Sequence, residues 1–324
     1  MVYHVVKEVK GKKYNYLIHT FKDSGKTKKI TKYIGPGKLP KEKIKKLMEE
    51  SKIHFETQII LLKQNLAINT YKAEFLTPEK VKWVQELQNQ YISYFEPFSE
   101  IEKKNYDDYF KVKYIYNSAS IEGNTLTMGE TGLILKEGIM PTGKSVREVK
   151  EIINLKNCID FRRDYKGDVT EDFIKKLNKT ILEGINNGGG EYKKNPNYIS
   201  GTDFEPTLPM MVPLEMQGLI KWYNEEKKKR HILELACIFH QKFVMIHPFP
   251  DGNGRTVREL FNFILSRKRF PEIIFQVKQR KEYFDALERG DHGDFKPLIE
   301  FSFKVLKEEY KEIFNQTRGL DNWL

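Results

Sequence analysis

The chain is poor in cysteine and lacks long apolar runs. Its 324 residues include two cysteines, Cys158 and Cys237, with no spacing typical of a zinc site. We therefore expect two buried, reduced thiols. No stretch of 18 apolar residues and no apolar signal run at the N-terminus are present. These absences predict a cytoplasmic protein with no membrane partner. Internal repeats and low-complexity tracts are also absent.

Arginine is absent from residues 1–50, which nevertheless carry most of the positive charge. This segment holds 14 lysines and 5 acidic residues, so it contributes +9 to a total net charge of +11. Tyrosines interleave with these lysines at Tyr3, Tyr14, Tyr16 and Tyr33, which suits stacking on bases. The lack of arginine argues against base-specific readout in a major groove. Two interpretations stay open: a solvated module that packs or forms a homo-oligomer, and a surface for nucleic acid or an acidic partner.

The first part of the chain alternates as strands do. Residues 2–9, 14–21 and 28–34 are separated by glycine-containing turns, and Pro40 opens a lysine-rich helix to about residue 52. We therefore predict a basic, β-rich module over residues 1–55.

From about residue 76 the hydrophobic period is helical. The predicted helices lie near 78–93, 100–121, 128–137, 146–164, 170–185, 213–229, 231–246, 253–268, 280–289 and 293–315. We divide this part into a helical region, 56–145, and a core with C-terminal helices, 146–324. The predicted fold is mainly α. The exception is residues 186–212, a long irregular loop rich in glycine and proline, of the kind that is usually functional.

Residues 247–258 read His-Pro-Phe-Pro-Asp-Gly-Asn-Gly-Arg-Thr-Val-Arg, and they carry the chemistry of a phosphate site. His247 follows a buried helix and is the side chain here that can accept a proton near neutral pH. The run from Gly252 to Gly254 tolerates positive φ, so successive amide groups can form an anion-binding nest at the start of the next helix.

The charged residues of the same stretch complete this chemistry. Arg255 and Arg258, three residues apart, project from one side of the new helix and can hold a polyphosphate. Asp251 offers a hard oxygen ligand suited to Mg²⁺ that bridges phosphates. Each residue alone has an ordinary structural interpretation, but their combination at this spacing favours a phosphate-handling site.

This stretch resembles the signature of the Fic family, His-Pro-Phe-x-(Asp/Glu)-Gly-Asn-Gly-Arg-x-x-Arg, and matches every fixed position. The resemblance extends over residues 77–310, including the helix leading into the motif, Phe239 to Ile246, and the one after it, with Arg280, Tyr283 and Leu287. It implies a helical-bundle core with a β-flap. It also implies an enzyme that transfers AMP from ATP to a Ser, Thr or Tyr hydroxyl of a protein, with self-modification expected.

The resemblance also implies a role for each motif residue. His247 would be the general base, Asp251 would hold Mg²⁺, Gly252, Asn253 and Gly254 would form the anion site, and Arg255 and Arg258 would bind phosphate. Relatives that phosphorylate their target have lysine at the position of Gly254, so glycine favours nucleotidyl transfer. It leaves the nucleotide donor open.

A second motif lies upstream, at Ser118-Ala-Ser-Ile-Glu122-Gly123. Ser118 and Glu122 share a helix face, and Gly123 ends that helix. The stretch resembles the Fic inhibitory motif, (Ser/Thr)-x-x-x-Glu-(Gly/Asn). The resemblance implies that Glu122 pairs with Arg258 and so withholds that arginine from ATP.

The irregular segment resembles the Fic flap, which binds a target protein segment as an added strand. The resemblance places this function at residues 190–212 and assigns Tyr198, Ile199 and Tyr283 to the flap and nucleotide pocket. The family usually has arginine where Lys193 stands.

Two alternatives to an autoinhibited adenylyltransferase stay open. One is a phosphodiesterase that removes AMP, with Glu122 positioning the attacking water. The other is a nucleic-acid-associated regulator acting through the basic module, residues 1–50.

Overall fold

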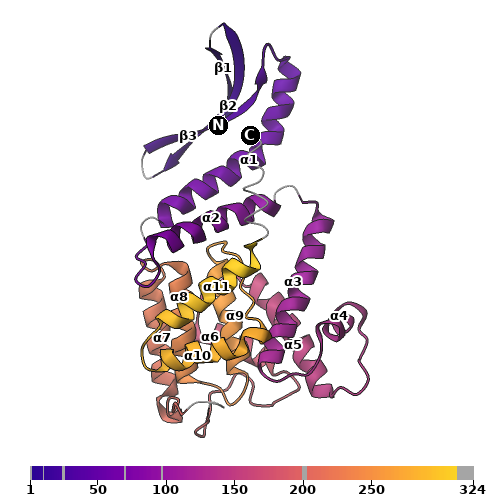
Figure 1. The fold of residues 1–324 in the computed structure, drawn as a ribbon, viewed down its shortest axis with the longest axis vertical. Coiled ribbons are helices and arrows are strands. Elements are labelled where there is room, and N and C mark those ends of the chain that lie inside the picture. Colours follow the sequence, from indigo (N-terminus) through magenta and orange to yellow (C-terminus); the bar gives the residue numbers. More distant parts are fainter. Residues whose placement is uncertain are drawn as a thin grey trace. The chain divides into compact units, whose positions relative to one another are not determined.

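The structure is a computed structural model that describes residues 2–9, 11–23, 26–68, 71–95, 98–198 and 203–311. It divides into two compact units between Tyr71 and Lys72. The mainly α fold is confirmed, with one small sheet at the start of the chain (Figure 1). The predicted boundaries near residues 55 and 145 stay predictions. In the described part of the chain, no helix combines the length and apolarity needed to cross a bilayer.

The first unit is an antiparallel meander followed by a long helix. Strands β1 (Val2–Val9), β2 (Lys12–Asp23) and β3 (Lys26–Pro36) lie in that order in the sheet, and α1 spans Lys41–Ile68. Leu17 of β2 and Phe55 of α1 are fully buried, and the Phe55 ring contacts His19 at 5.6 Å between centroids. The sheet therefore packs one face on α1.

Helix α1 corrects the prediction, because it ends at Ile68 and not near residue 52. No glycine or proline occurs between Pro40 and Pro78, so no residue breaks the helix where the lysine-rich pattern stops. Strand β1 has the predicted ends, while β2 and β3 run two residues beyond each predicted end.

The second unit contains the predicted helices, with ends shifted by a few residues. They are α2 (Pro78–Phe95), α3 (Glu100–Ile121), α4 (Met128–Glu137), α5 (Val146–Asp164), α6 (Glu171–Ile181), α7 (Val212–Glu226), α8 (Ile232–Ile246), α9 (Asn253–Ser266), α10 (Arg280–Asp291) and α11 (Lys296–Glu309). Short 3-10 turns, η1 (Pro209–Met211) and η2 (Val277–Gln279), precede α7 and α10. The end of the last predicted helix, residues 312–315, lies outside the described residues.

Helices α8 and α9 form the centre of this unit (Figure 1). Helix α8 packs against α9 and also contacts α7, α10 and α11, while α9 contacts α3, α5 and α6. Cys237 lies in α8 and Cys158 in α5, and both are buried and free, as predicted. The short connection between α8 and α9 is thus held at both ends by a packed core.

The irregular segment runs beside that connection. The Lys193 N–H donates to the Pro248 carbonyl at 2.9 Å, and the Thr207 N–H donates to the Met245 carbonyl at 3.2 Å. Among the described residues of 186–208, turns and bends occur but no strand. Strand formation by the predicted flap, through pairing with a target, stays a prediction.

Candidate active site

The connection between α8 and α9 contains two residues in the left-handed backbone conformation. His247 ends α8 with φ 48° and ψ 58°, and its N–H donates to Phe243. Gly252 precedes α9 with φ 76°, and a Cβ at this position would lie 3.0 Å from Asn178 Nδ2. Glycine is therefore required at 252 by both conformation and space.

Asn253 braces the connection with its side chain. Its Oδ1 accepts the Phe249 N–H at 2.9 Å, and its Nδ2 donates to the Phe249 carbonyl at 2.7 Å. Each polar end of the buried side chain thus has a partner in Phe249, while Nδ2 retains a second hydrogen. Asn253 also lines the cavity described below, and its part in an anion site stays a prediction.

The start of α9 presents backbone donors to the cavity. The first helical hydrogen bond runs from the Thr256 N–H to the Gly252 carbonyl, so the amides of residues 253–255 precede the helical ladder. Gly254 lies within α9 and does not have positive φ, in contrast to our expectation for the whole glycine run. A Cβ on Gly254 would lie 2.2 Å from Glu122 Oε1, so this glycine makes room for the carboxylate.

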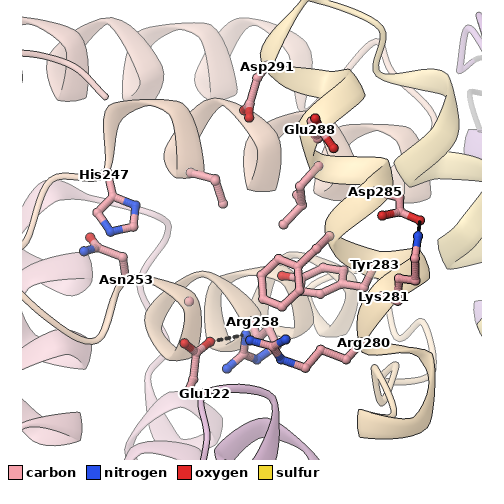
Figure 2. Close-up of a pocket in the computed structure, with 14 residues that line it drawn as sticks. Glu122, His247, Asn253, Arg258, Arg280, Lys281, Tyr283, Asp285, Glu288 and Asp291 are labelled. Atoms are coloured by element: carbon pink, nitrogen blue, oxygen red, sulfur yellow. Dashed lines mark hydrogen bonds and ion pairs between the residues drawn. The ribbon is translucent and has the colours of Figure 1, made fainter. Parts of the chain in front are cut away.

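Glu122 therefore lies at the anion-favouring end of α9 and binds the second arginine of the motif. Its Oε1 is 2.8 Å from Arg258 Nη1, and Figure 2 marks this ion pair with a dashed line. Arg258 Nε donates to Ser118 Oγ at 3.0 Å, and Nη2 donates to the Ser118 carbonyl at 2.8 Å. Burial lowers the pKa of Arg258, but the Glu122 carboxylate, together with Tyr283 and Tyr114, raises it by more, so the net pKa is raised. The structure thus brings Ser118, Glu122 and Arg258 together.

Arg255 faces a different pair of carboxylates. Its Nη1 lies 3.2 Å from Glu151 Oε1, and its Nη2 lies 3.1 Å from Asp251 Oδ1. Arg255 is 4% exposed, and its buried Nε has no hydrogen-bond partner among the described residues. The two arginines of the motif therefore have separate acidic partners.

A cavity of about 310 Å³ lies beside Glu122 and Arg258 (Figure 2), and neither Asp251 nor Arg255 is among the residues that line it. Glu122, His247, Gly254 and Arg258 line one part, and residues of α10, including Tyr283, line the other. Burial, and to a lesser extent the Lys193 cation, lower the pKa of His247 to about 4. The histidine is therefore neutral near pH 7 and able to accept a proton.

Lys193 holds the backbone on either side of His247. It is 4% exposed, and its Nζ donates to Asn197 Oδ1 at 2.7 Å and to the Ile246 carbonyl at 3.3 Å. Burial lowers the pKa of this lysine to about 8. Asn197 Nδ2 in turn donates to the Phe249 carbonyl at 3.0 Å. The irregular segment is thus hydrogen bonded through Lys193 and Asn197 to the connection between α8 and α9.

The far side of the cavity is built by α10. Tyr283 is 2% exposed, and its hydroxyl lies 2.8 Å from His240 Nε2. Arg280 Nε donates to the Ile121 carbonyl at 2.8 Å, which connects α10 to the end of α3. Of the two predicted flap residues, Tyr198 is 84% exposed and does not line the cavity, while Ile199 lies outside the described residues.

Asp251 fits a Mg²⁺ ion shared with phosphates. No group of three or more His, Cys, Asp or Glu side chains suited to a metal occurs among the described residues. Mg²⁺, however, is commonly bound by one or two carboxylates together with substrate phosphates and water. The Asp251 side chain is 31% exposed and borders the start of α9, so it can serve as that single carboxylate.

Two supporting residues escaped the sequence-based prediction. Asn178 of α6 is fully buried; it donates to the Asp251 carbonyl at 3.0 Å and accepts the Gly190 N–H at 2.9 Å. Glu151 of α5 binds Arg255, as described above. Both are ordinary polar residues in helical patterns, and only the assembled fold brings them to the site.

Comparisons with known proteins agree with this geometry. The Fic/DOC family profile matches residues 168–265. Protein adenylyltransferase fic-1 of Caenorhabditis briggsae is 31% identical over 232 residues, which cover 69% of this chain and 45% of the relative. The chain thus spans less than half the length of this curated relative.

Solved structures show the same similarity. A Fic-domain-containing signaling protein from Bacteroides thetaiotaomicron is 31% identical, with a TM-score of 0.65 over 73% of this chain and 98% of that chain. Fic-1 from Caenorhabditis elegans is 26% identical, with a TM-score of 0.64 over 74% of this chain and 72% of that chain.

Proposed function

The chain belongs to the Fic/DOC family, and from this premise we propose that it is an autoinhibited protein adenylyltransferase. The substrate is ATP, and the acceptor is a Ser, Thr or Tyr hydroxyl of a protein. The observation that carries the proposal is the arrangement of a neutral His247 and the phosphate-binding start of α9 around one cavity, with Glu122 bound to Arg258 inside it.

The proposed reaction needs one base and a way to hold the triphosphate. His247 accepts the proton of the target hydroxyl as its oxygen forms a bond to the α-phosphorus. The bond from that phosphorus to the bridging oxygen breaks, and pyrophosphate leaves. The amides of residues 253–255 and the side chain of Arg255 hold the charge on the phosphates. Mg²⁺, held by Asp251, would neutralise phosphate charge when bound.

Autoinhibition follows from the position of Glu122. Its carboxylate lies against Gly254 and Arg258, where the terminal phosphate of ATP would need to bind. Anionic phosphate and the carboxylate repel each other there, and Arg258 cannot bind both. ATP is therefore held in an unreactive position, or excluded, until α3 moves.

A labelling experiment tests the chemistry. The Glu122→Gly variant is incubated in lysate with ATP labelled at the α- or the γ-phosphate. AMP transfer predicts protein labelling from the α position alone, including labelling of the enzyme itself. His247→Ala in the same background should abolish it. Labelling from the γ position would contradict the proposal and indicate phosphorylation instead.

Removal of AMP is a second candidate function, favoured by the position of Glu122 in the same cavity as His247. There the carboxylate could position the attacking water. This reading predicts that wild-type protein releases AMP from a modified target and that Glu122→Gly loses this activity. The adenylyltransferase reading predicts that Glu122→Gly gains transfer.

Several predictions about the proposed enzyme depend on partners. We propose that the target segment binds along residues 190–212, whose ends are hydrogen bonded to the catalytic turn and to α8. The cytoplasmic location and the formation of a homo-oligomer stay predictions.

A further inference from the structure

The meander of the first unit has one face with a distinct composition. In an antiparallel sheet, residues directly opposite each other project from the same face. The register pairs Lys7 with Tyr14, Tyr3 with Ile18, and Tyr16 with Tyr33. By the same register, one face carries four tyrosines and four lysines. We call it the tyrosine–lysine face: Tyr3, Tyr14, Tyr16, Tyr33, Lys7, Lys12, Lys22 and Lys29.

No acidic residue of the three strands lies on this face. The two strand acids, Glu8 and Asp23, pair with Lys13 and Lys26, in the alternate positions that belong to the opposite face. That opposite face is the one that contacts α1, since it includes Leu17 and His19. The charged residues that the three strands place on the tyrosine–lysine face are thus all lysines.

Three of the four aromatic rings of this face lie together. The Tyr33 ring lies 5.4 Å from that of Tyr16 and 6.3 Å from that of Tyr14, measured between centroids. The Lys7 ammonium lies 5.1 Å from the Tyr16 centroid. Tyr33 is 49% exposed and Tyr3 is 40% exposed. Large aromatic rings with lysines beside them are therefore open to a ligand.

We propose that the tyrosine–lysine face binds single-stranded nucleic acid, with bases stacked on the tyrosine rings and phosphates paired with the lysines. Each base has a π-face, so aromatic platforms bind single strands with little sequence preference. The absence of carboxylates removes the repulsion that a phosphate backbone would otherwise meet. An acidic protein would match the charge equally well but would not require four tyrosines on the same face.

Fluorescence anisotropy with the full chain tests the proposal. The probe is a labelled mixed-sequence oligonucleotide of about 20 nucleotides, used as RNA, as single-stranded DNA and as duplex DNA. Binding is measured at about 50 and 200 mM salt. We expect the single strands to bind more tightly than the duplex, and the ratio of RNA to DNA affinity identifies the preferred strand. Tyr16→Leu with Tyr33→Leu should weaken binding roughly tenfold or more. Lys7→Gln with Lys29→Gln should reduce the salt slope by about 1.4.

Matched variants separate stacking from folding and from general charge. Tyr16→Phe with Tyr33→Phe keeps the rings and should keep the affinity. Tyr109→Leu and Lys82→Gln alter an exposed tyrosine and an exposed lysine of the second unit and should have no effect. Absence of single-strand binding at low salt, or tyrosine-independent binding, would overturn the proposal. Equal binding of polyglutamate would favour an acidic partner instead, and concentration-dependent self-association without oligonucleotide binding would favour an interface between copies.

Discussion

Gly254 and Glu122 show how one missing side chain permits a regulatory contact. A Cβ at position 254 would lie 2.2 Å from Glu122 Oε1, so any larger residue would displace the carboxylate from Arg258. The same glycine lies in the first turn of α9, where the backbone amides attract an anion. The Glu122 carboxylate thus occupies a site whose electrostatics suit phosphate, and under the proposed function it would compete there with ATP.

Ser118 should contribute to inhibition in a graded way. Ser118→Ala removes the hydrogen bond from Arg258 Nε to the hydroxyl but leaves the bond to the Ser118 carbonyl. We expect the basal rate of AMP transfer to rise by up to about tenfold, less than with Glu122→Gly, because one charged hydrogen bond of several is lost. Ser120→Ala, on the same helix, is the control, and an unchanged rate in Ser118→Ala would remove Ser118 from the inhibitory contact.

Lys193 should affect the pH profile through His247. The Lys193 cation lowers the pKa of His247, so Lys193→Met should raise that pKa. In the Glu122→Gly background, the acid limb of kcat/KM should move to higher pH by about 0.5 to 1 unit, since His247 then becomes protonated at higher pH.

Two variants control for this shift. Lys193→Arg keeps the positive charge and should leave the acid limb of kcat/KM unchanged. Lys179→Met changes an exposed lysine of α6 and should likewise leave it unchanged. A Lys193→Met profile that loses amplitude without any shift would indicate that Lys193 only supports the turn.

Among the helices, α3 carries Ser118 and Glu122 of the proposed inhibitory motif, and two hydrogen bonds near its C-terminal end connect it to neighbouring elements. Asn117 Oδ1 accepts the Val277 N–H at 2.9 Å, and Arg280 Nε donates to the Ile121 carbonyl at 2.8 Å. These bonds connect α3 to η2 and to α10, and α10 builds the opposite wall of the cavity. Movement of α3 that releases Arg258 would therefore have to break its contacts with η2 and α10.

Removing the hydrogen bond between Asn117 and Val277 should increase the rate of AMP transfer. Asn117→Ala leaves the partly buried Val277 N–H without its acceptor, so we expect the free energy of unfolding to fall by about 1–3 kcal/mol. It should also raise basal AMP transfer and the hydrogen exchange of residues 112–123. Asn154→Ala is the matched control, because Asn154 is similarly buried and bonds to the Ile181 and Glu183 carbonyls. If both variants activate equally, the effect is general destabilisation.

The sequence predicted the elements better than their contacts. Helical period and caps, such as the capping box at Thr127, are local and placed the helices of the second unit within a few residues. The predicted end of α1, near residue 52, was wrong because no glycine or proline stops the helix there. The pairing of Glu122 with Arg258 was expected only through the family resemblance. Asn178 and Glu151 reach the site through packing of α5 and α6 on α9, which no local pattern encodes.

At the scale of the whole molecule, buried histidines make stability depend on pH. Burial lowers the pKa of His240 to about 3 and that of His231 to about 4. The unfolded chain binds protons at these histidines near pH 6.5, whereas the folded chain does not until lower pH. Stability from these groups is therefore present above pH 6.5 and is lost as pH falls through 6.5 toward the folded-state values.

Chemical denaturation at pH 7.5 and 5.5 measures this effect. Between pH 7.5 and 5.5, the free energy of unfolding of His240→Gln should fall by about 1.4 kcal/mol less than that of the wild type. The variant lacks a histidine that binds a proton in the unfolded chain but not in the folded chain over this range. Asp291, whose pKa is raised to about 6 mainly by burial, is common to both proteins and cancels in the comparison. Equal losses in both proteins would mean that His240 is protonated in the folded state.

The central claim is that a complete adenylyl-transfer site is held inactive by Glu122. Its most direct test is the initial rate of protein labelling from α-labelled ATP by wild type, Glu122→Gly and Glu137→Gly, the last changing an exposed glutamate at the end of α4. The account predicts slow labelling by wild type and Glu137→Gly and much faster labelling by Glu122→Gly. Equal rates in all three proteins would contradict it.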